Sequence, residues 1–268
     1  MGIHDEFAAV TPVHPPAPYI GGKRKLAARL VQQIGAVPHR TYAEVFVGMG
    51  GVFFRRQKQP RAEVINDRNG EVANLFRILQ RHYPQFMDTL RWQLTGRREF
   101  ERLQASNAAS LTDLERAGRF LYLQKTAFGG KVAGQSFGVD PSSSASFNLT
   151  RLEPLLAEVH ERLAGVTIEC LDWLPFIDRY DRAETLFYLD PPYFGSERDY
   201  GATLFGREQF EVMAERLSRL KGRFILSIND VPAIRKIFAA FDQDEVQLNY
   251  TVGGGKGRPA RELIITPR

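Results

Sequence analysis

The residues best suited to chemistry form one short run after an apolar segment. Asp190, Pro191, Pro192 and Tyr193 directly follow 185–189, and residue frequencies give this tetrapeptide by chance in about one chain per thousand of this length. Proline fixes φ and lacks an N–H, so the loop is stiff and the Pro191 carbonyl remains an acceptor. With the Asp190 carboxylate it can accept both hydrogens of an NH2 group, while Tyr193 offers a face for stacking. The run predicts a site for an aromatic amine such as a nucleobase.

A glycine turn and a later acid predict a second part of the same site. In an open α/β sheet, ligands lie outside the carboxyl ends of the strands. Gly48 and Gly50 end the segment 41–47, and such a turn lets backbone N–H groups and a helix N-terminus approach a ligand. Asp67 follows Gly50 by 17 residues, near the separation at which an acid accepts hydrogen bonds from a ribose. Phe53 replaces the third glycine of a dinucleotide fingerprint and no Gly-Lys-Ser/Thr loop exists, so the pattern favours a nucleoside-bearing cofactor other than NAD or ATP.

The elements that would position these residues alternate between strand-like and helix-like segments. Apolar, β-branched runs predict strands at 41–47, 62–65, 166–171, 185–189, 224–228, 245–252 and 262–266. Helical periodicity predicts helices at 23–34, 72–79, 210–220 and 234–238. This order predicts an α/β fold with a mostly parallel sheet. The last two strands, joined by the glycine-rich 253–257, predict a C-terminal antiparallel hairpin.

The middle of the chain interrupts this alternation and carries the excess positive charge. The expected division is an extended, proline-containing lead-in, a catalytic domain in two segments and a mainly helical inserted subdomain: 1–18, 19–80 with 155–268, and 81–154. Structure is expected to begin near Tyr19. Of the net charge of +5, residues 81–151 contribute ten Lys or Arg against six Asp or Glu, and the other 197 residues hold 26 against 25. A polyanion-binding subdomain fits this balance, and a solvated basic face fits it equally well.

An arginine cluster in the insertion has the spacing of a phosphate contact. Arg97, Arg98 and Arg102 lie within about one helical turn of one another and can contact phosphates together. Glu99 and Glu101 lie in the same stretch. A solvated, salt-bridged face therefore explains the cluster equally well.

The composition excludes several classes of protein. With 43% apolar and 25% charged residues, the chain matches a globular protein, and no run approaches 18 apolar residues. The N-terminus lacks a secretory pattern, so we expect a cytoplasmic protein. The five histidines lack metal-ligand spacing and Cys170 is the only cysteine, so we expect neither a metal site nor a disulfide. Cys170 is expected to be a buried strand residue.

Five short motifs occur in a fixed order along the chain. They are Tyr-Ile-Gly-Gly-Lys at 19–23, Glu-Val-Phe-Val-Gly-Met-Gly at 44–50, Asn-Asp at 66–67, Asp-Trp at 172–173 and Asp-Pro-Pro-Tyr at 190–193. Together they resemble the motifs of the Dam-type, D12-class N6-adenine DNA methyltransferases, with Val45 in place of the usual proline. Glu-Leu-Ile-Ile at 262–265 resembles the last strand of that family. The resemblance implies a Rossmann-like methyltransferase fold with an inserted target-recognition subdomain.

The resemblance also implies a role for each motif. The residues implied to shape an S-adenosylmethionine site are Tyr19, Lys23, Phe46, Gly48, Gly50, Asp67, Asp172, Trp173 and Asp190, with Lys23 at the methionine carboxylate. The residues implied to hold a flipped-out adenine are Asp190, Pro191 and Tyr193. The implied activity is methyl transfer to adenine N6 in double-stranded DNA. N4-cytosine methylation, RNA N6-adenine methylation and a non-catalytic DNA-binding protein of the same fold are the alternatives.

The insertion contains a stretch that departs from the recognition motif of this family. Residues 121–131 resemble Asn-Arg-aromatic-Gly-aromatic-Asn-Gly, but Gln-Lys-Thr at 124–126 replaces the opening, and Ala133 stands where GATC-reading members place an arginine. GATC specificity is therefore not carried over. The candidate DNA contacts are Lys125, Lys131, Arg97 and Arg98. A cognate restriction endonuclease is a candidate partner, and a nucleoid-associated monomer is the default expectation.

Overall fold

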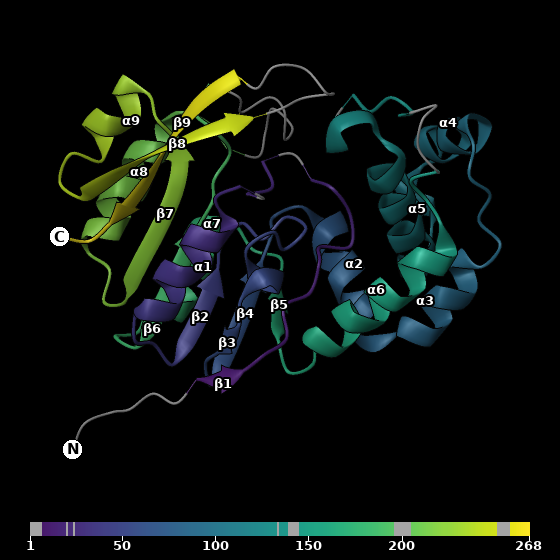
Figure 1. The fold of residues 1–268 in the computed structure, drawn as a ribbon, viewed down its shortest axis with the longest axis horizontal. Helices are drawn as coiled ribbons and strands as arrows, with labels where there is room; N and C mark the ends of the chain where they lie inside the picture. Colours follow the sequence, from purple (N-terminus) through teal and green to yellow (C-terminus); the bar gives the residue numbers. More distant parts are fainter. Residues whose placement is uncertain are drawn as a thin grey trace.

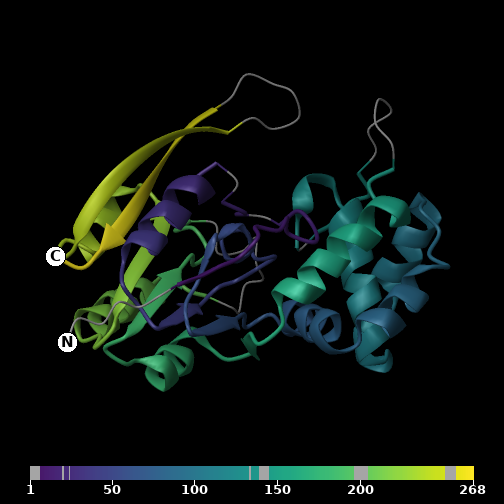
Figure 2. The ribbon, with the colours of Figure 1, turned by 60° about the horizontal axis from the view of Figure 1, so that its bottom comes forward.

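The structure of the chain, a computed structural model, has two lobes. It describes residues 7–19, 21–23, 25–132, 134–138, 145–195, 205–250 and 258–268, without the side chains of 249, 250, 258 and 259. An α/β lobe and a helical lobe lie side by side in both views (Figures 1 and 2). Ala133 and the hairpin turn at 253–257 lie outside the described residues.

The α/β lobe is built on one sheet. Within the described residues, seven strands pair in the order β5-β4-β2-β6-β7-β9-β8. Their bounds are β2 (Thr41–Glu44), β4 (Ala62–Asn66), β5 (Thr167–Glu169), β6 (Thr185–Leu189), β7 (Arg223–Asn229), β8 (Asp242–Tyr250) and β9 (Arg258–Thr266). The pairs from β5 to β7 are parallel, while β9 is antiparallel to both β7 and β8. The predicted α/β fold, with a mostly parallel sheet and an antiparallel C-terminal hairpin, is confirmed.

Helices cover both faces of this sheet, so the central strand β6 is buried at every residue. Successive residues of a strand point to opposite faces, and Tyr42 packs in one core cluster while Ala43 packs in the other. The first cluster lies under α1 (Ala27–Ala36) and α2 (Gly70–Arg81). The second lies under α7 (Trp173–Tyr180), α8 (Glu208–Ser218) and α9 (Pro232–Ile237).

The helical lobe lies between β4 and β5 in the sequence. It contains α3 (Tyr83–Leu90), α4 (Arg97–Ala105), α5 (Asp113–Thr126), α6 (Leu149–Arg162) and the short 3-10 turns Ala108–Ser110 and Phe128–Gly130. Its buried side chains belong to the same cluster as those under α1 and α2, and α6 runs across the predicted boundary at residue 154. The described helices include none that is both long and apolar enough to cross a bilayer.

The lead-in is more structured than the sequence predicts. β1 (Ala8–Ala9) pairs antiparallel with β3 (Lys58–Gln59), and Val13 and Ala17 are buried. The prediction that structure begins near Tyr19 is therefore wrong. A two-residue strand has no periodicity to detect, and its pairing partner lies about 50 residues further along the chain.

A buried ion cluster joins the helical lobe to the sheet. Glu63 on β4 accepts two hydrogen bonds from Arg162 of α6, with Nη1–Oε2 and Nη2–Oε1 distances of 2.7 and 2.8 Å. Arg56 forms an ion pair with the same carboxylate, and Gln59 donates to it at 3.0 Å. All three charged side chains are buried. Glu63 is therefore the shared counter-ion of two buried guanidinium groups, those of Arg56 and Arg162.

Candidate active site

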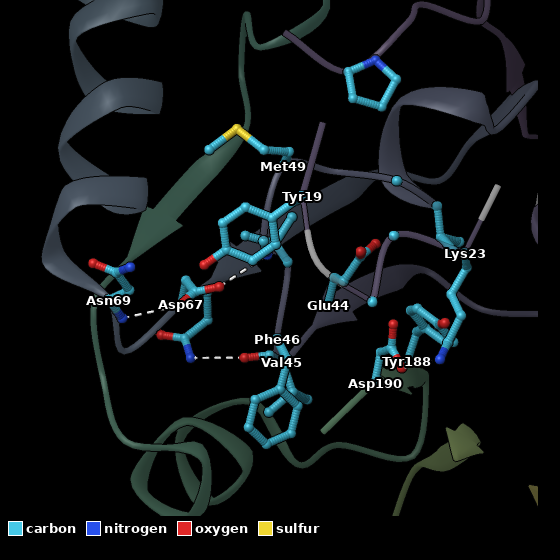
Figure 3. A pocket seen from close by; sticks show the side chains of 18 of the residues that line it. Tyr19, Lys23, Glu44, Val45, Phe46, Met49, Asp67, Asn69, Tyr188 and Asp190 are labelled. Atoms are coloured by element: carbon cyan, nitrogen blue, oxygen red, sulfur yellow. Dashed lines mark hydrogen bonds and ion pairs between the residues drawn. The ribbon is translucent and has the colours of Figure 1, made fainter. Parts of the chain in front are cut away.

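A pocket of about 730 Å³ opens at the carboxyl ends of the parallel strands. Of the residues predicted from sequence, those that line it are Tyr19, Lys23, Phe46, Gly48, Asp67, Lys125, Asp172, Trp173 and Asp190. Figure 3 shows the side chains of Asp67, Glu44 and Asp190 at successive positions along its floor. The predicted residues outside its lining are Gly50, Pro191, Tyr193, Arg97, Arg98 and Lys131. Five separate motifs thus meet at one cavity.

The glycine turn after β2 and Asp67 after β4 are directly bonded. The Gly48 N–H donates to Asp67 Oδ2 and the Asn69 N–H donates to Oδ1, both at 2.8 Å. Gly48 has φ +51°, and a Cβ there would lie 3.0 Å from the Tyr19 ring, so glycine is required. Burial raises the Asp67 pKa to about 6, although both backbone hydrogen bonds oppose this shift. Each Asp67 oxygen keeps a lone pair for a ligand hydroxyl.

Asn66, the last residue of β4, bonds both to the chain after β2 and to the chain after β5. Its Nδ2 donates to the carbonyls of Val45 (3.0 Å) and Leu171 (3.1 Å), and its Oδ1 accepts from the Leu171 N–H at 2.8 Å. The next residue, Asp172, accepts from the Trp173 N–H at 2.7 Å and caps α7. Cys170 is exposed, so its predicted burial is wrong. The reason is that β5 ends at Glu169, one residue before it.

The predicted catalytic run after β6, residues 190–193, is held by side chains from elsewhere in the fold. Lys23 Nζ lies 2.8 Å from Asp190 Oδ1 and donates to the Tyr193 hydroxyl at 2.8 Å. The Tyr193 hydroxyl in turn donates to Glu262 Oε1 at 2.5 Å. Lys23 and Glu262 are each 1% exposed, whereas Asp190 keeps 18% of its side chain exposed toward the pocket.

Side chains of strand β7 also bond to the residues that follow β6. Ser227 donates to Asp190 Oδ1 at 3.2 Å and is paired with the Tyr188 hydroxyl at 2.8 Å. Asn229 accepts from the Phe194 N–H at 2.9 Å and donates to the Phe194 carbonyl at 3.0 Å. Burial raises the Asp190 pKa to about 6, and Lys23 opposes that shift. Asp190 is therefore held rigidly and is mostly ionised at pH 7.

Two groups of lining residues have no role in the sequence prediction. The first is Glu44, a buried acid at the end of β2, which accepts from the Tyr42 hydroxyl at 2.6 Å. Burial raises the Glu44 pKa to about 8. The second is the lead-in segment, which contributes His14, Pro15, Ala17 and Pro18. Glu44 could have been predicted, because ligands lie at the carboxyl ends of the strands and Glu44 ends β2. No local sequence signal identifies the lead-in as part of the pocket wall.

The four candidate DNA contacts fall into two groups. Lys125 on α5 lines the pocket, and partial burial lowers its pKa. Arg97, Arg98 and Lys131 are exposed on the helical lobe, with the Arg97 guanidinium 5.4 Å from the centre of the Phe137 ring. The structure therefore brings only Lys125 to the cavity.

The preceding residue, Gln124, is fully buried and links the helical lobe to the pocket wall. Its Nε2 donates to the carbonyls of Pro18 (2.8 Å) and Gly130 (2.6 Å). The described residues include no group of three or more His, Cys, Asp or Glu side chains that could hold a metal ion. The charged side chains that line the pocket are the acids Glu44, Asp67, Asp172 and Asp190 and the bases Lys23, Arg55, Arg68 and Lys125.

Comparison with known proteins decides the family. Residues 19–252 match the D12 class N6 adenine-specific DNA methyltransferases. The chain belongs to this family. The resemblance of the five motifs is confirmed, and the protein is an adenine-specific DNA methyltransferase with the Rossmann-like fold of that family.

Similar methyltransferases come from a virus, a bacterium and an archaeon. The type II methyltransferase M.CviBI of Paramecium bursaria Chlorella virus NC1A is 23% identical over 228 residues, which cover 84% of this chain and 87% of the relative. M1.LlaDCHI of Lactococcus lactis subsp. cremoris is 24% identical over 269 residues (92% and 93%). M.MjaIII of Methanocaldococcus jannaschii is 24% identical over 203 residues (68% and 69%). All three are named as type II methyltransferases, the class that takes part in restriction-modification.

Proposed function

We propose that this methyltransferase transfers a methyl group from S-adenosylmethionine to the N6 atom of an adenine flipped out of double-stranded DNA. The observation that supports this most directly is the Asp190 carboxylate, held by Lys23 and Ser227 while part of it faces the pocket. The same cavity contains Asp67 and the Gly48 turn. One cavity can therefore hold a nucleoside cofactor beside an amine acceptor.

The pocket residues fit the nucleoside part of this cofactor. Asp67 has lone pairs for ribose hydroxyls, and Gly48 lets the backbone approach closely. Phe46 and Trp173 present aromatic surface, and the Asp172 carboxylate can accept from an exocyclic amine. The volume of about 730 Å³ lies in the range of small-molecule sites, about 300–1,000 Å³. When bound, S-adenosylmethionine supplies an electrophilic methyl group on its sulfonium.

Asp190 and the Pro191 carbonyl act on the target amine. The N6 lone pair of adenine is conjugated into the ring and is a poor nucleophile. Hydrogen bonds from the amine to Asp190 and Pro191 draw this lone pair out of conjugation and stabilise the positive charge that grows on nitrogen. A carboxylate with a pKa of about 6 is too weak a base to deprotonate a neutral aromatic amine, so proton loss follows methyl transfer. No covalent enzyme intermediate is required.

Tyr193 and the basic residues act on the nucleic acid. The Tyr193 hydroxyl is bonded to Lys23 and Glu262, which fixes its ring for stacking with the flipped base. Extrusion of the base costs a few kcal/mol, and cationic contacts with phosphates help to offset it. We assign these contacts to Lys131, Arg97 and Arg98, with Lys125 at the flipped nucleotide itself.

Labelled methyl transfer to unmethylated genomic DNA tests this function. Wild-type protein should produce N6-methyladenine, and Asp190→Ala should lose at least 100-fold in rate while binding DNA normally, because amine polarisation is lost. Asp178→Ala is the matched control, because that acid is 57% exposed on α7 and pairs with Arg216. Full activity of Asp190→Ala with normal folding would overturn the mechanism.

Nucleoside mass spectrometry of treated DNA and RNA separates the alternatives. N4-methylcytosine or N6-methyladenine confined to RNA would replace the proposed substrate, and absence of product together with DNA binding would indicate a non-catalytic protein. A cognate restriction endonuclease, a monomeric state and nucleoid association stay predictions. Size-exclusion chromatography with light scattering tests the monomer.

A further inference from the structure

A buried carboxylate from the C-terminal hairpin lies beside the catalytic run. Glu262 is 1% exposed on β9, which lies between β7 and β8 in the sheet. Its register partner on β7 is Asn229, the residue that holds the Phe194 backbone. Two paired positions on neighbouring strands therefore hold the loop that starts at Asp190.

Lys23 connects Glu262 to Asp190. Its Nζ lies 2.8 Å from Asp190 Oδ1, 2.8 Å from the Tyr193 hydroxyl and 3.4 Å from Glu262 Oε2. It also lies 4.2 Å from the centre of the Tyr193 ring. An ammonium has three donors, and three protein acceptors surround this one. This geometry directs Lys23 toward the catalytic run rather than toward the methionine carboxylate of the cofactor.

The backbone around Lys23 supports this orientation. The Gly22 N–H donates to the Tyr19 carbonyl at 3.0 Å, forming a tight turn. The Lys23 carbonyl then accepts from the N–H groups of Leu26 and Ala27 at 3.0 and 2.6 Å, which starts α1. The Lys23 side chain therefore leaves a fixed backbone position and reaches buried acceptors.

We infer that Glu262 is a positioning residue for methyl transfer: through Lys23 and Tyr193 it fixes the Asp190 carboxylate and the Tyr193 ring in the arrangement that holds the target amine. The inference rests on the proposed function, because it concerns the contacts of the proposed amine acceptor. Nothing in the motif pattern assigns Glu262 a role beyond the last strand. The inference depends on the contacts of Glu262 with Tyr193 and Lys23.

The charge of Glu262 matters as well as its geometry. With Glu262 ionised, the Lys23 ammonium is shared between two carboxylates. Without that second charge, Lys23 would neutralise Asp190 more fully, and Asp190 would stabilise the positively charged amine less well. Loss of the Glu262 charge should also lower the Asp190 pKa, because Glu262 raises it.

The groups that face Asp190 come from every neighbouring element. They are Lys23 from the turn before α1, Glu44 from β2, Tyr188 from β6, Tyr193 from the loop after β6, Ser227 from β7 and Glu262 from β9. Only Lys23 among them is cationic. If substitution of residue 262 changes the pH profile, that change therefore reports on how the Lys23 ammonium is shared between Asp190 and Glu262.

Glu262→Gln tests the inference, because glutamine keeps the size and acceptor oxygen but removes the charge. In labelled methyl transfer, kcat should fall on the order of 10–100-fold, with little change in KM for S-adenosylmethionine. The acid limb of the kcat–pH profile should move to lower pH, following the Asp190 pKa. Glu262→Asp, which keeps the charge, should leave the acid limb in place and restore part of kcat.

Glu245→Gln is the matched control. Glu245 lies on β8, opposite Leu263 of β9, and pairs with Arg235. This control should keep the wild-type kcat and pH profile. Wild-type kcat and an unmoved acid limb in Glu262→Gln would overturn the inference, as would a rise in KM with unchanged kcat.

The outcomes separate this inference from the proposed function. If wild-type protein methylates neither DNA nor RNA, the proposed function fails whatever residue 262 does. If wild-type protein is active and Glu262→Gln does not fold, Glu262→Asp decides. A reduced kcat at an unchanged melting temperature then supports positioning, and a wild-type kcat overturns it.

Discussion

Removing one carboxylate should destabilise the whole chain, because two buried arginines share Glu63 as their counter-ion. Arg162 binds Glu63 in bidentate geometry at 2.7 and 2.8 Å, and Arg56 pairs with the same carboxylate. Glu63→Gln keeps the shape but removes the carboxylate that pairs with both guanidinium groups. Burial already lowers the pKa of Arg56 and of Arg162 to about 10. Burial therefore already disfavours the charged form of both guanidinium groups, and loss of their shared carboxylate adds to that cost.

Breaking a buried ion pair from one side typically costs about 3–5 kcal/mol. For a chain of this size, each kcal/mol lowers the melting temperature by about 2–4 °C, so Glu63→Gln should melt about 6–20 °C lower. Urea unfolding followed by circular dichroism measures the free energy, and calorimetry measures the temperature. Glu184→Gln is the matched control, because Glu184 is 50% exposed and lies 3.5 Å from Arg40. Such a surface pair contributes about 1 kcal/mol or less.

A variant that replaces all three charged residues of the cluster tests whether the loss of stability comes from unpaired charge or from lost packing. Arg56→Met, Glu63→Leu and Arg162→Met together remove all three charges at similar volume, and such replacements are often neutral or stabilising. The triple variant should therefore be more stable than Glu63→Gln alone. A loss below about 1 kcal/mol for Glu63→Gln, or a triple variant as unstable as the single one, would refute the reasoning.

Four other variants test the site and the DNA face. The Glu44 pKa of about 8 exceeds its ordinary 4.5, so the wild-type fold loses stability as the pH rises between these two values. Glu44→Gln does not titrate, so its melting temperature should exceed that of wild type by more at about pH 9 than at about pH 5.5. A pH-independent difference would contradict this. Asn229→Ala removes both hydrogen bonds to the Phe194 backbone in the loop after β6 and should lower kcat about tenfold. An unchanged kcat would mean that the loop is held by other contacts. Arg97→Ala and Arg98→Ala should each reduce the salt slope of DNA affinity by about 1. Arg219→Ala, directly after α8, should not change it. Unchanged slopes for Arg97→Ala and Arg98→Ala would remove both residues from the DNA face.

The sequence predicts the pocket well where a local rule applies. Parallel strands place their carboxyl ends at one edge of a sheet, so Asp67, Asp172 and Asp190 each follow an apolar run and meet at one cavity. Gly48 is predictable for a similar reason, because a turn with positive φ requires glycine there. The order of elements likewise follows from periodicity, which is why the α/β fold is predicted correctly.

The prediction fails where a contact depends on distant parts of the chain. β1 pairs with β3 across about 50 residues, and neither two-residue strand has a pattern of its own. Cys170 lies just beyond the end of β5, and strand ends are the least certain part of any prediction from periodicity. Asn229 is an ordinary polar residue at the end of the apolar strand β7. Its function as an anchor depends on the loop that passes over it.

Asp67 and Asp190 show why the same residue type at the same kind of position acquires different chemistry. Both follow parallel strands, and burial raises the pKa of each to about 6. Backbone N–H groups hold Asp67; they carry no net charge, so its carboxylate remains a full anion suited to neutral hydroxyls. Asp190 faces the Lys23 cation. In the mechanism that we propose, this cation would weaken Asp190 as an acceptor for an amine that gains positive charge. We infer that Glu262, the second carboxylate beside Lys23, offsets this loss. Glu262 reaches this position from β9, which is antiparallel to β7.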